Sequence, residues 1–114
     1  MTLDEYFSTG PDFERPIFDA VMEHLGAVGP VYVEPVSVGI FLKSTRTFAE
    51  LRPKSKWVAL SISLRRQVSH PRIGPKVQRW GGRYYHVFNL RSPAEFDQQI
   101  RAWLTEAYLL DADD

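Results

Sequence analysis

Histidine is the residue type in this chain best suited to proton transfer or ligand contact near neutral pH, and it occurs at His24, His70 and His86. His24 falls on the polar side of a predicted helix, and His70 precedes a proline in a basic stretch. His86 differs, because strict alternation along residues 84–90 places it among mostly apolar side chains. Such an imidazole can act as a general base or contact a ligand, or it can be a core histidine that hydrogen-bonds a neighbouring element. Both interpretations stay open, and the packed histidine is the commoner one.

Other catalytic arrangements find little support in the sequence. The chain has no cysteine, so a thiol nucleophile, a disulfide framework and a Cys-ligated zinc site are excluded. The histidines occur in neither the His-x-x-x-His nor the His-Glu-x-x-His spacing that is typical of zinc sites on helices. Ser61, Ser63 and Ser69 lack the glycine-flanked turn that exposes a nucleophilic serine. We therefore predict no catalytic residue, no metal and no cofactor, with an enzyme that uses His86 kept as an alternative.

The charged residues are segregated along the chain although the formal net charge is zero. Residues 1–42 hold seven acids and one base, residues 43–91 hold twelve bases and one acid, and residues 92–114 hold six acids and one base. A basic middle can bind an anionic partner, whereas acidic helices that neutralise a basic sheet are the simpler explanation.

Nucleic acid is one partner that the basic stretch could bind. Residues 65–85 interleave six bases with Trp80, Tyr84 and Tyr85, a combination that can pair phosphates with stacking rings. A basic connection lying over a sheet has the same composition, and the acidic ends of the chain oppose a polyanion. Nucleic-acid binding is therefore the alternative hypothesis.

The first hypothesis is a non-catalytic binding or interaction module for an anionic small molecule or a protein segment. In this hypothesis the ligand lies against one face of a strand and contacts the basic connection next to that strand. The residues predicted to bind the ligand are Arg72, Arg83, Tyr85 and His86.

Alternating apolar residues predict a mainly antiparallel meander of about five strands. Residues 31–42 form either one strand broken at Pro35 or two strands, since a proline indicates an edge position or a bulge. The residues expected to share one face of this segment are Val36, Val38, Ile40 and Leu42. Further strands are expected at residues 47–52, 57–64, 77–80 and 84–90, the last two joined through Gly81-Gly82.

Residues 57–64 alternate most cleanly, with large apolar side chains on one face and the small residues Ala59, Ser61 and Ser63 on the other. Small side chains could form the floor of a shallow groove. The solvent-facing side of a two-layer sheet gives the same pattern and is the commoner explanation.

Helices are predicted before and after the sheet. Thr2 and Glu5 have the spacing of a capping box, which predicts a short helical turn at residues 3–8. A longer helix should run from about residue 12 to residue 26, with Pro16 in its first turn, where a missing N–H costs little.

The C-terminal helix follows the last strand directly. Ser92 and Glu95 have capping-box spacing, and Pro93 suits the first helical position. Apolar residues then recur at helical spacing up to residue 107 and define a stripe that must be buried. The sequence thus predicts a two-layer α+β fold with an N-terminal and a C-terminal helix flanking the sheet.

A chain of 114 residues suits one domain, with residues 1–11 as an arm or short helix and residues 111–114 as a frayed acidic tail. The first residues do not read as a secretory leader, and no apolar stretch is long enough to span a bilayer. We expect a soluble, cytoplasmic protein without a membrane partner.

Six segments spread over nearly the whole chain form a pattern: residues 2–7, 17–19, 48–49, 71–73, 86–93 and 103–108. In this order they resemble the bacterial family catalogued as domain of unknown function 5655. The resemblance implies a small cytoplasmic α+β domain, distantly similar to YdhG-like and YjbR-like proteins, and implies no particular reaction. By position, His86 and Arg72 match polar residues of the family pattern. Tyr108 stands at its C-terminal end and joins the predicted ligand-binding residues.

Overall fold

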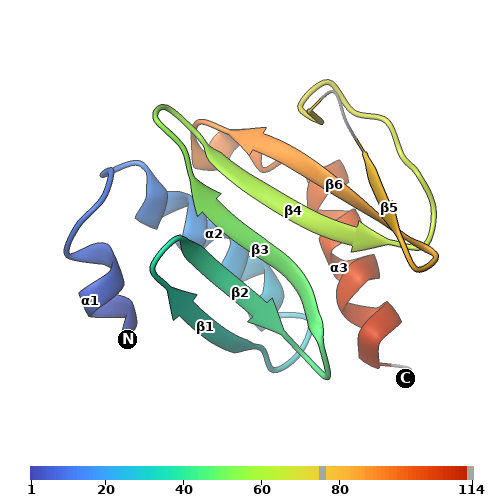
Figure 1. The fold of residues 1–114 in the computed structure, drawn as a ribbon, viewed down its shortest axis with the longest axis horizontal. Coiled ribbons are helices and arrows are strands. Elements are labelled where there is room, and N and C mark those ends of the chain that lie inside the picture. The colour runs from blue at the N-terminus through green and yellow to red at the C-terminus, as the bar shows by residue number, and fades with distance from the viewer. Residues whose placement is uncertain (75–76, 113–114) are drawn as a thin grey trace.

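The computed structural model describes residues 1–74 and 77–112, which form three α-helices, one 3₁₀ helix and six strands (Figure 1). Asp113 and Asp114 of the predicted acidic tail lie outside the described residues. In chain order the elements are α1 (Leu3–Phe7), α2 (Glu14–Gly26), β1 (Tyr32–Val36), β2 (Gly39–Lys43), β3 (Thr47–Pro53), β4 (Val58–Leu64), β5 (Gln78–Trp80), β6 (Arg83–Leu90), η1 (Pro93–Glu95) and α3 (Gln98–Ala112).

The six strands form one antiparallel sheet in the order β1-β2-β3-β4-β6-β5. Strands β1 to β4 follow one another as a meander, and β6 then pairs with β4 while β5 forms a hairpin on the other side of β6. This confirms the predicted α+β class and antiparallel sheet. The structure has one strand more than the five or so expected, because the segment 31–42 divides into β1 and β2.

The division between β1 and β2 falls at a turn formed by residues 37 and 38 and not at Pro35. Pro35 lies within β1, at the edge of the sheet, where a residue without an N–H group is tolerated. Val38 lies in the turn that follows, and its side chain is 58% exposed. The prediction that Val36 and Val38 share a face with Ile40 and Leu42 is therefore wrong, because the hairpin interrupts the alternation and Val36 pairs with Gly39, on the other face from Ile40.

Glycines at positions 39, 81 and 82 occur where a side chain would not fit or would be strained. A Cβ atom on Gly39 would lie 2.4 Å from the carbonyl oxygen of Leu51, so β2 and β3 pair closely only because residue 39 is glycine. Gly81 and Gly82 have φ values of 57° and 81° and connect β5 to β6 in the predicted two-residue hairpin.

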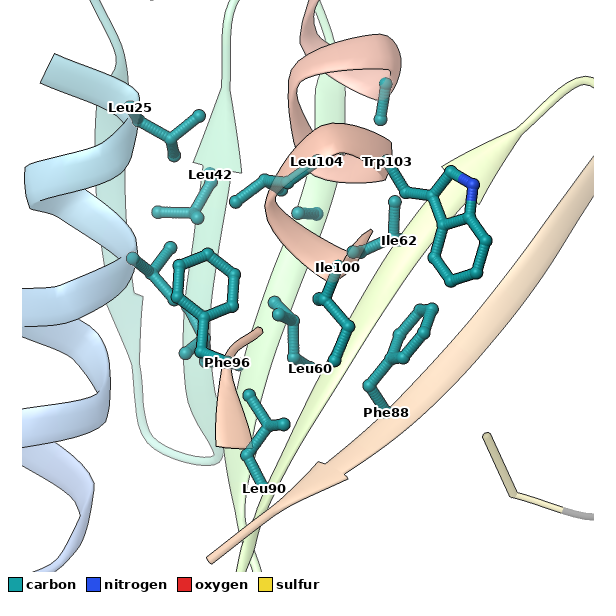
Figure 2. Close-up of a cluster of buried hydrophobic side chains, with 14 of the residues drawn as sticks. Leu25, Leu42, Leu60, Ile62, Phe88, Leu90, Phe96, Ile100, Trp103 and Leu104 are labelled. Atoms are coloured by element: carbon teal, nitrogen blue, oxygen red, sulfur yellow. The ribbon is translucent and has the colours of Figure 1, made fainter. Parts of the chain in front are cut away.

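Helices α2 and α3 cover one face of the sheet, and the apolar core lies between the two layers (Figure 1). Figure 2 shows side chains of β4, β6 and α3 meeting there, among them Leu60, Phe88 and Ile100. All four core-facing residues of β4 are fully buried: Val58, Leu60, Ile62 and Leu64. Each such side chain stabilises the fold by roughly 1.5–3 kcal/mol relative to exposure to water.

The N-terminal helix α1 begins as the sequence predicts. Thr2 accepts a hydrogen bond from the Glu5 amide at 3.1 Å, and the Glu5 side chain returns to the Thr2 backbone, which completes the capping box. Tyr6 joins α1 to the next helix, because its hydroxyl donates a hydrogen bond to the buried carboxylate of Glu14 in the first turn of α2. Pro16 also lies in that first turn, as expected.

The C-terminal helix begins later than the sequence indicates. Residues 93–95 form the 3₁₀ helix η1 without a side-chain hydrogen bond from Ser92, and the Glu95 carboxylate accepts from the Arg91 amide instead. Asp97 accepts a hydrogen bond from the Ile100 amide at 2.9 Å at the start of α3. The predicted capping box at Ser92 is therefore wrong, and Asp97 takes the capping role.

The long basic connection between β4 and β5 runs against the edge of β6. The Gly74 amide donates to the Val87 carbonyl at 2.9 Å, and the Asn89 amide donates to the Arg72 carbonyl at 3.0 Å. Val68, earlier in the connection, is buried in the core. These contacts hold the described part of the connection beside the sheet.

Candidate functional site

The second face of the sheet has no helix over it in the described structure (Figure 1). Phe41, Glu50, Ser61 and Val87 lie in one row across β2, β3, β4 and β6. Their neighbours along each strand point into the core, and because successive side chains alternate, this row points the other way. We call this side the open face.

Two shallow hollows adjoin on the open face and share Glu50, Ser61 and Tyr85. The first has a volume of approximately 270 Å³ and the second approximately 280 Å³. The small side chains of Ser61 and its neighbours on β4 form the floor of both hollows. A shallow groove at these residues was one of the two explanations that the sequence pattern allowed. The first is also lined by Phe41, Thr47, Phe48, Ala49 and Ser63, and the second by Arg52, Lys54, Ala59, Gln78 and Val87. We call the pair of hollows the open-face groove.

The groove has an aromatic part and a charged part. Phe41 and Tyr85 line the first hollow, whereas Arg52 and Lys54 line the second. The Glu50 carboxylate lies 3.5 Å from the Arg52 guanidinium, so the acid in the groove has a cationic neighbour. A ligand with an apolar body and a negative group would meet suitable partners at the two ends.

The β5–β6 hairpin extends the groove beyond Tyr85. Gln78 pairs with Tyr85 and Trp80 pairs with Arg83, so these four residues share the open face. Trp80 is 77% exposed and Tyr85 is 36% exposed. Together with Gln78 and Arg79, the two rings line a further hollow.

The structure does not bring the five residues predicted from the sequence together. Tyr85 is on the open face, but His86, its chain neighbour, points into the core and is completely buried. Alternation along β6 alone separates these two side chains. Of the predicted set, Tyr85 lines the groove, and Arg83 lies beside it in the hairpin.

His86 serves as a hydrogen-bond acceptor within the core. Its Nε2 atom accepts a hydrogen bond of 3.0 Å from the buried amide of Val68. Burial lowers the pKa of His86, and the backbones of Ile62 and Tyr84 offset only part of this effect. The neutral imidazole thereby anchors the start of the basic connection, and its Nε2 is already engaged.

Arg72 and Tyr108 also have partners that account for their positions. The Arg72 guanidinium lies 3.0 Å from the Glu95 carboxylate of η1. The Tyr108 hydroxyl donates to the Pro30 carbonyl at 2.8 Å, and its ring packs edge-on against Phe48 with the centroids 5.3 Å apart. Their assignment to a ligand site stays a prediction.

A histidine–aspartate pair forms that the sequence did not reveal. Nε2 of His70 lies 2.9 Å from the Asp97 carboxylate, while Nδ1 accepts a hydrogen bond from the Arg72 amide. The ring packs edge-on against both Phe88 and Trp103. Both nitrogens are engaged, so this pair ties the basic connection to the start of α3. No local sequence pattern indicates this contact, because the two residues are far apart in the sequence and meet only in the folded chain.

Several bases of the middle segment pair with acids from other elements. The Arg66 guanidinium lies 2.9 Å from the Glu106 carboxylate of α3, and the Lys43 ammonium lies 2.6 Å from Glu34 of β1. With the Arg72 pair, these contacts agree with the simpler explanation of the charge segregation, in which acidic elements neutralise a basic sheet and its connections.

The described residues also bear on two other kinds of site. Residues 1–74 and 77–112 contain no group of three or more histidine and acidic side chains placed to hold a metal ion. None of the helices within this part of the chain has the length and apolar character needed to cross a membrane.

Comparison with known proteins identifies the family. No curated protein and no solved structure matches the chain, and the similarity to YdhG-like and YjbR-like proteins stays a prediction. The sequence profile of the family described as Domain of unknown function (DUF5655) matches residues 3–111, nearly the whole chain. The protein therefore belongs to the DUF5655 family.

Proposed function

We propose that the protein is a non-catalytic binding module whose open-face groove holds an anionic ligand with a flat, apolar body. The supporting observation is a sheet face without a helix over it, hollowed above Ser61 and Ser63 and bordered by Phe41 and Tyr85. Ligand sites are typically concave and mostly apolar, with a few polar groups that set orientation.

The apolar body of the ligand lies in the first hollow. Phe41 and Tyr85 present aromatic surface there, and Ser63 below them is 4% exposed, so the floor is already packed. A preformed floor means that little ordering is needed on binding, which favours affinity.

The negative group of the ligand lies in the second hollow, near Arg52 and Lys54. Arg52 balances the nearby Glu50 carboxylate, and Lys54 at the adjacent turn supplies further positive charge. A charge-assisted contact to an arginine or lysine gives more binding energy than a neutral hydrogen bond.

Catalysis is not part of this proposal. His86, the candidate base, faces the core, and its Nε2 accepts from the Val68 amide. His70 has both ring nitrogens engaged, by Asp97 and by the Arg72 amide. Neither imidazole borders the groove.

The probe for this function is anilinonaphthalene sulfonate, a flat aromatic anion that fluoresces when it is bound. We expect saturable binding at one site of the folded protein. Ser61→Tyr fills the floor and should abolish binding, while Arg52→Ala should weaken it about tenfold, the effect of losing a contact of roughly 1.4 kcal/mol.

The matched control is Ala102→Tyr, which adds the same side chain at an exposed position of α3 in the helix layer. It should bind the probe as the wild type does. Equal binding by wild type and Ser61→Tyr would place the ligand elsewhere, and absence of binding by the folded wild type would remove the proposal.

A further inference from the structure

The hollow at the β5–β6 hairpin is lined by two aromatic rings, an amide and a guanidinium. Its residues are Gln78, Arg79, Trp80 and Tyr85, and its volume is approximately 610 Å³. Trp80 is the most exposed large apolar side chain of the described residues, at 77%. A tryptophan held in water on a tight hairpin contributes little to the core, so packing does not explain it.

The register places the two rings at a useful separation. Trp80 pairs with Arg83, and Tyr85 is two residues further along β6, so Trp80 and Tyr85 are diagonal neighbours on one face. Diagonal neighbours in an antiparallel pair lie about 7–8 Å apart. Because flat groups in contact are about 3.5–4.0 Å apart, one planar ring can fit between them, or each can stack with a ring of its own.

The polar groups of this hollow suit a nucleobase. The Gln78 amide has both donors and an acceptor, as the edges of bases require. Arg79 pairs with Tyr84 on the other face of the hairpin, where its guanidinium lies 5.6 Å from the centre of the Tyr84 ring, so it borders this hollow only at the edge and the phosphate contacts fall to the cations of the groove. Stacking rings combined with cations are the usual means of binding single strands.

The site continues into the open-face groove and is not a closed pocket. Tyr85 belongs to both, Phe41 provides another ring across the sheet, and Arg52 and Lys54 lie beyond. From β2 to β5 these residues span four interstrand spacings of about 4.8 Å, or roughly 19 Å in all, which is longer than one nucleotide. Asp19 and Glu23 lie on α2, in the helix layer, so they do not face a strand bound on the open face, and Glu50, the acid that lines the groove, has Arg52 as its cationic neighbour.

We infer that the anionic ligand of the open face is a single-stranded nucleic acid, with a base stacked at Trp80 and Tyr85 and its backbone directed along the groove toward Arg52 and Lys54. This inference rests on the proposed function and names its ligand class. It predicts little sequence preference, because every base offers a flat face, and a marked dependence on salt.

The test uses fluorescein-labelled octathymidylate and octauridylate, measured by fluorescence anisotropy at several salt concentrations. Trp80→Ala should weaken binding about 5- to 150-fold, the range for loss of one stacked base, and Trp80→Phe should restore part of it. Each lost phosphate contact, as in Arg52→Ala or Lys54→Ala, should reduce the slope of log affinity against log salt by about 0.7.

Leu109→Ala is the matched control, since it removes an exposed apolar side chain from α3 and should leave binding unchanged. Because Trp80 is exposed, Trp80→Ala should fold normally, which circular dichroism checks.

If anilinonaphthalene sulfonate binds but neither oligonucleotide does, the inference fails and the proposed function stands. If neither probe binds, both fail. Adenosine monophosphate binding as tightly as the oligonucleotides would also overturn the strand assignment, as would full affinity in Trp80→Ala.

Discussion

Replacing Tyr6 by phenylalanine should destabilise the protein, and the size of the loss should depend on pH. The Tyr6 hydroxyl donates to the Glu14 carboxylate, and the two residues are only 8% and 2% exposed. Water cannot readily replace a donor at such a site. A hydrogen bond to a charged group contributes about 1.5–3 kcal/mol and one to a neutral group about 1 kcal/mol. We therefore expect a loss of about 2 kcal/mol where Glu14 is ionised.

The direction of the pH dependence follows from two opposing effects on Glu14. Burial raises its pKa, and the hydrogen bond from Tyr6 lowers it again in part. A carboxyl whose folded pKa exceeds its unfolded value contributes stability below the unfolded pKa, and this contribution is lost as pH rises through the folded pKa. Without the hydroxyl the pKa of Glu14 rises further. The gap in stability between wild type and Tyr6→Phe should therefore be smallest in acid and widen as pH rises.

Urea unfolding between pH 4 and pH 9 measures this gap. At neutral pH the thermal midpoint of Tyr6→Phe should fall by roughly 8 °C, taking about 4 °C per kcal/mol for a domain of this size. In the Glu14→Gln background the same substitution should show no pH dependence, since no carboxyl titrates.

Tyr108→Phe is the matched control for the hydroxyl. It removes a hydrogen bond to the Pro30 carbonyl, which does not titrate, so its cost should be about 1 kcal/mol at every pH. A loss in Tyr6→Phe that is equally independent of pH would refute the account of Glu14.

Three further substitutions test other parts of the fold. His86→Leu leaves the buried Val68 amide without its acceptor and should cost about 1–3 kcal/mol in urea unfolding. Because burial lowers the pKa of His86, its stabilising effect is lost as pH falls below the unfolded value, and the acid-side slope of stability should be shallower in the variant. Asp97→Ala removes the cap of α3 and should cost about 1–2 kcal/mol by thermal unfolding, whereas Asp97→Asn should keep most of the cap; equal losses would contradict the capping role. Gly39→Ala forces β2 from β3 and should cost about 1–3 kcal/mol, so an unchanged urea midpoint would show that the strands separate freely.

Local patterns in the sequence were sufficient for much of the fold. Alternation from Val58 to Leu64 predicted both faces of β4, and the spacing of Thr2 and Glu5 predicted the capping box of α1. Each of these features depends only on residues that belong to a single helical turn or a single strand. Gly81-Gly82 is of the same kind, because the hairpin conformation needs residues that accept positive φ.

The errors arose where two local signals competed. Ser92 and Glu95 have the spacing of a capping box, but the sequence does not show that η1 precedes α3, whose first turn is capped by Asp97. Val38 continued an alternating pattern, although the chain turns there. In each case the geometry of the neighbouring element decided between two acceptable conformations.

The candidate site was harder to predict because it depends on which strands are neighbours. Tyr85 and His86 were assigned to one site although alternation along β6 sends them to opposite faces. The groove is lined by Phe41, Ser61 and Tyr85, which come from three different strands. Only the order of the strands in the sheet brings them to one surface. The same holds for His70 and Asp97, whose contact requires the basic connection to fold back over α3.

The division of β4 into a core face and an open face also limits how this family can vary in length. Deletion of one residue from β4 would shift its register, so that Ser61 and Ser63 would enter the core while Leu60 and Ile62 would turn toward water. This one shift, which exchanges the core face and the open face of β4, would thus disrupt both the core and the groove. A substitution on the open face can leave the fold intact, whereas insertions and deletions should be confined to connections such as the one between β4 and β5.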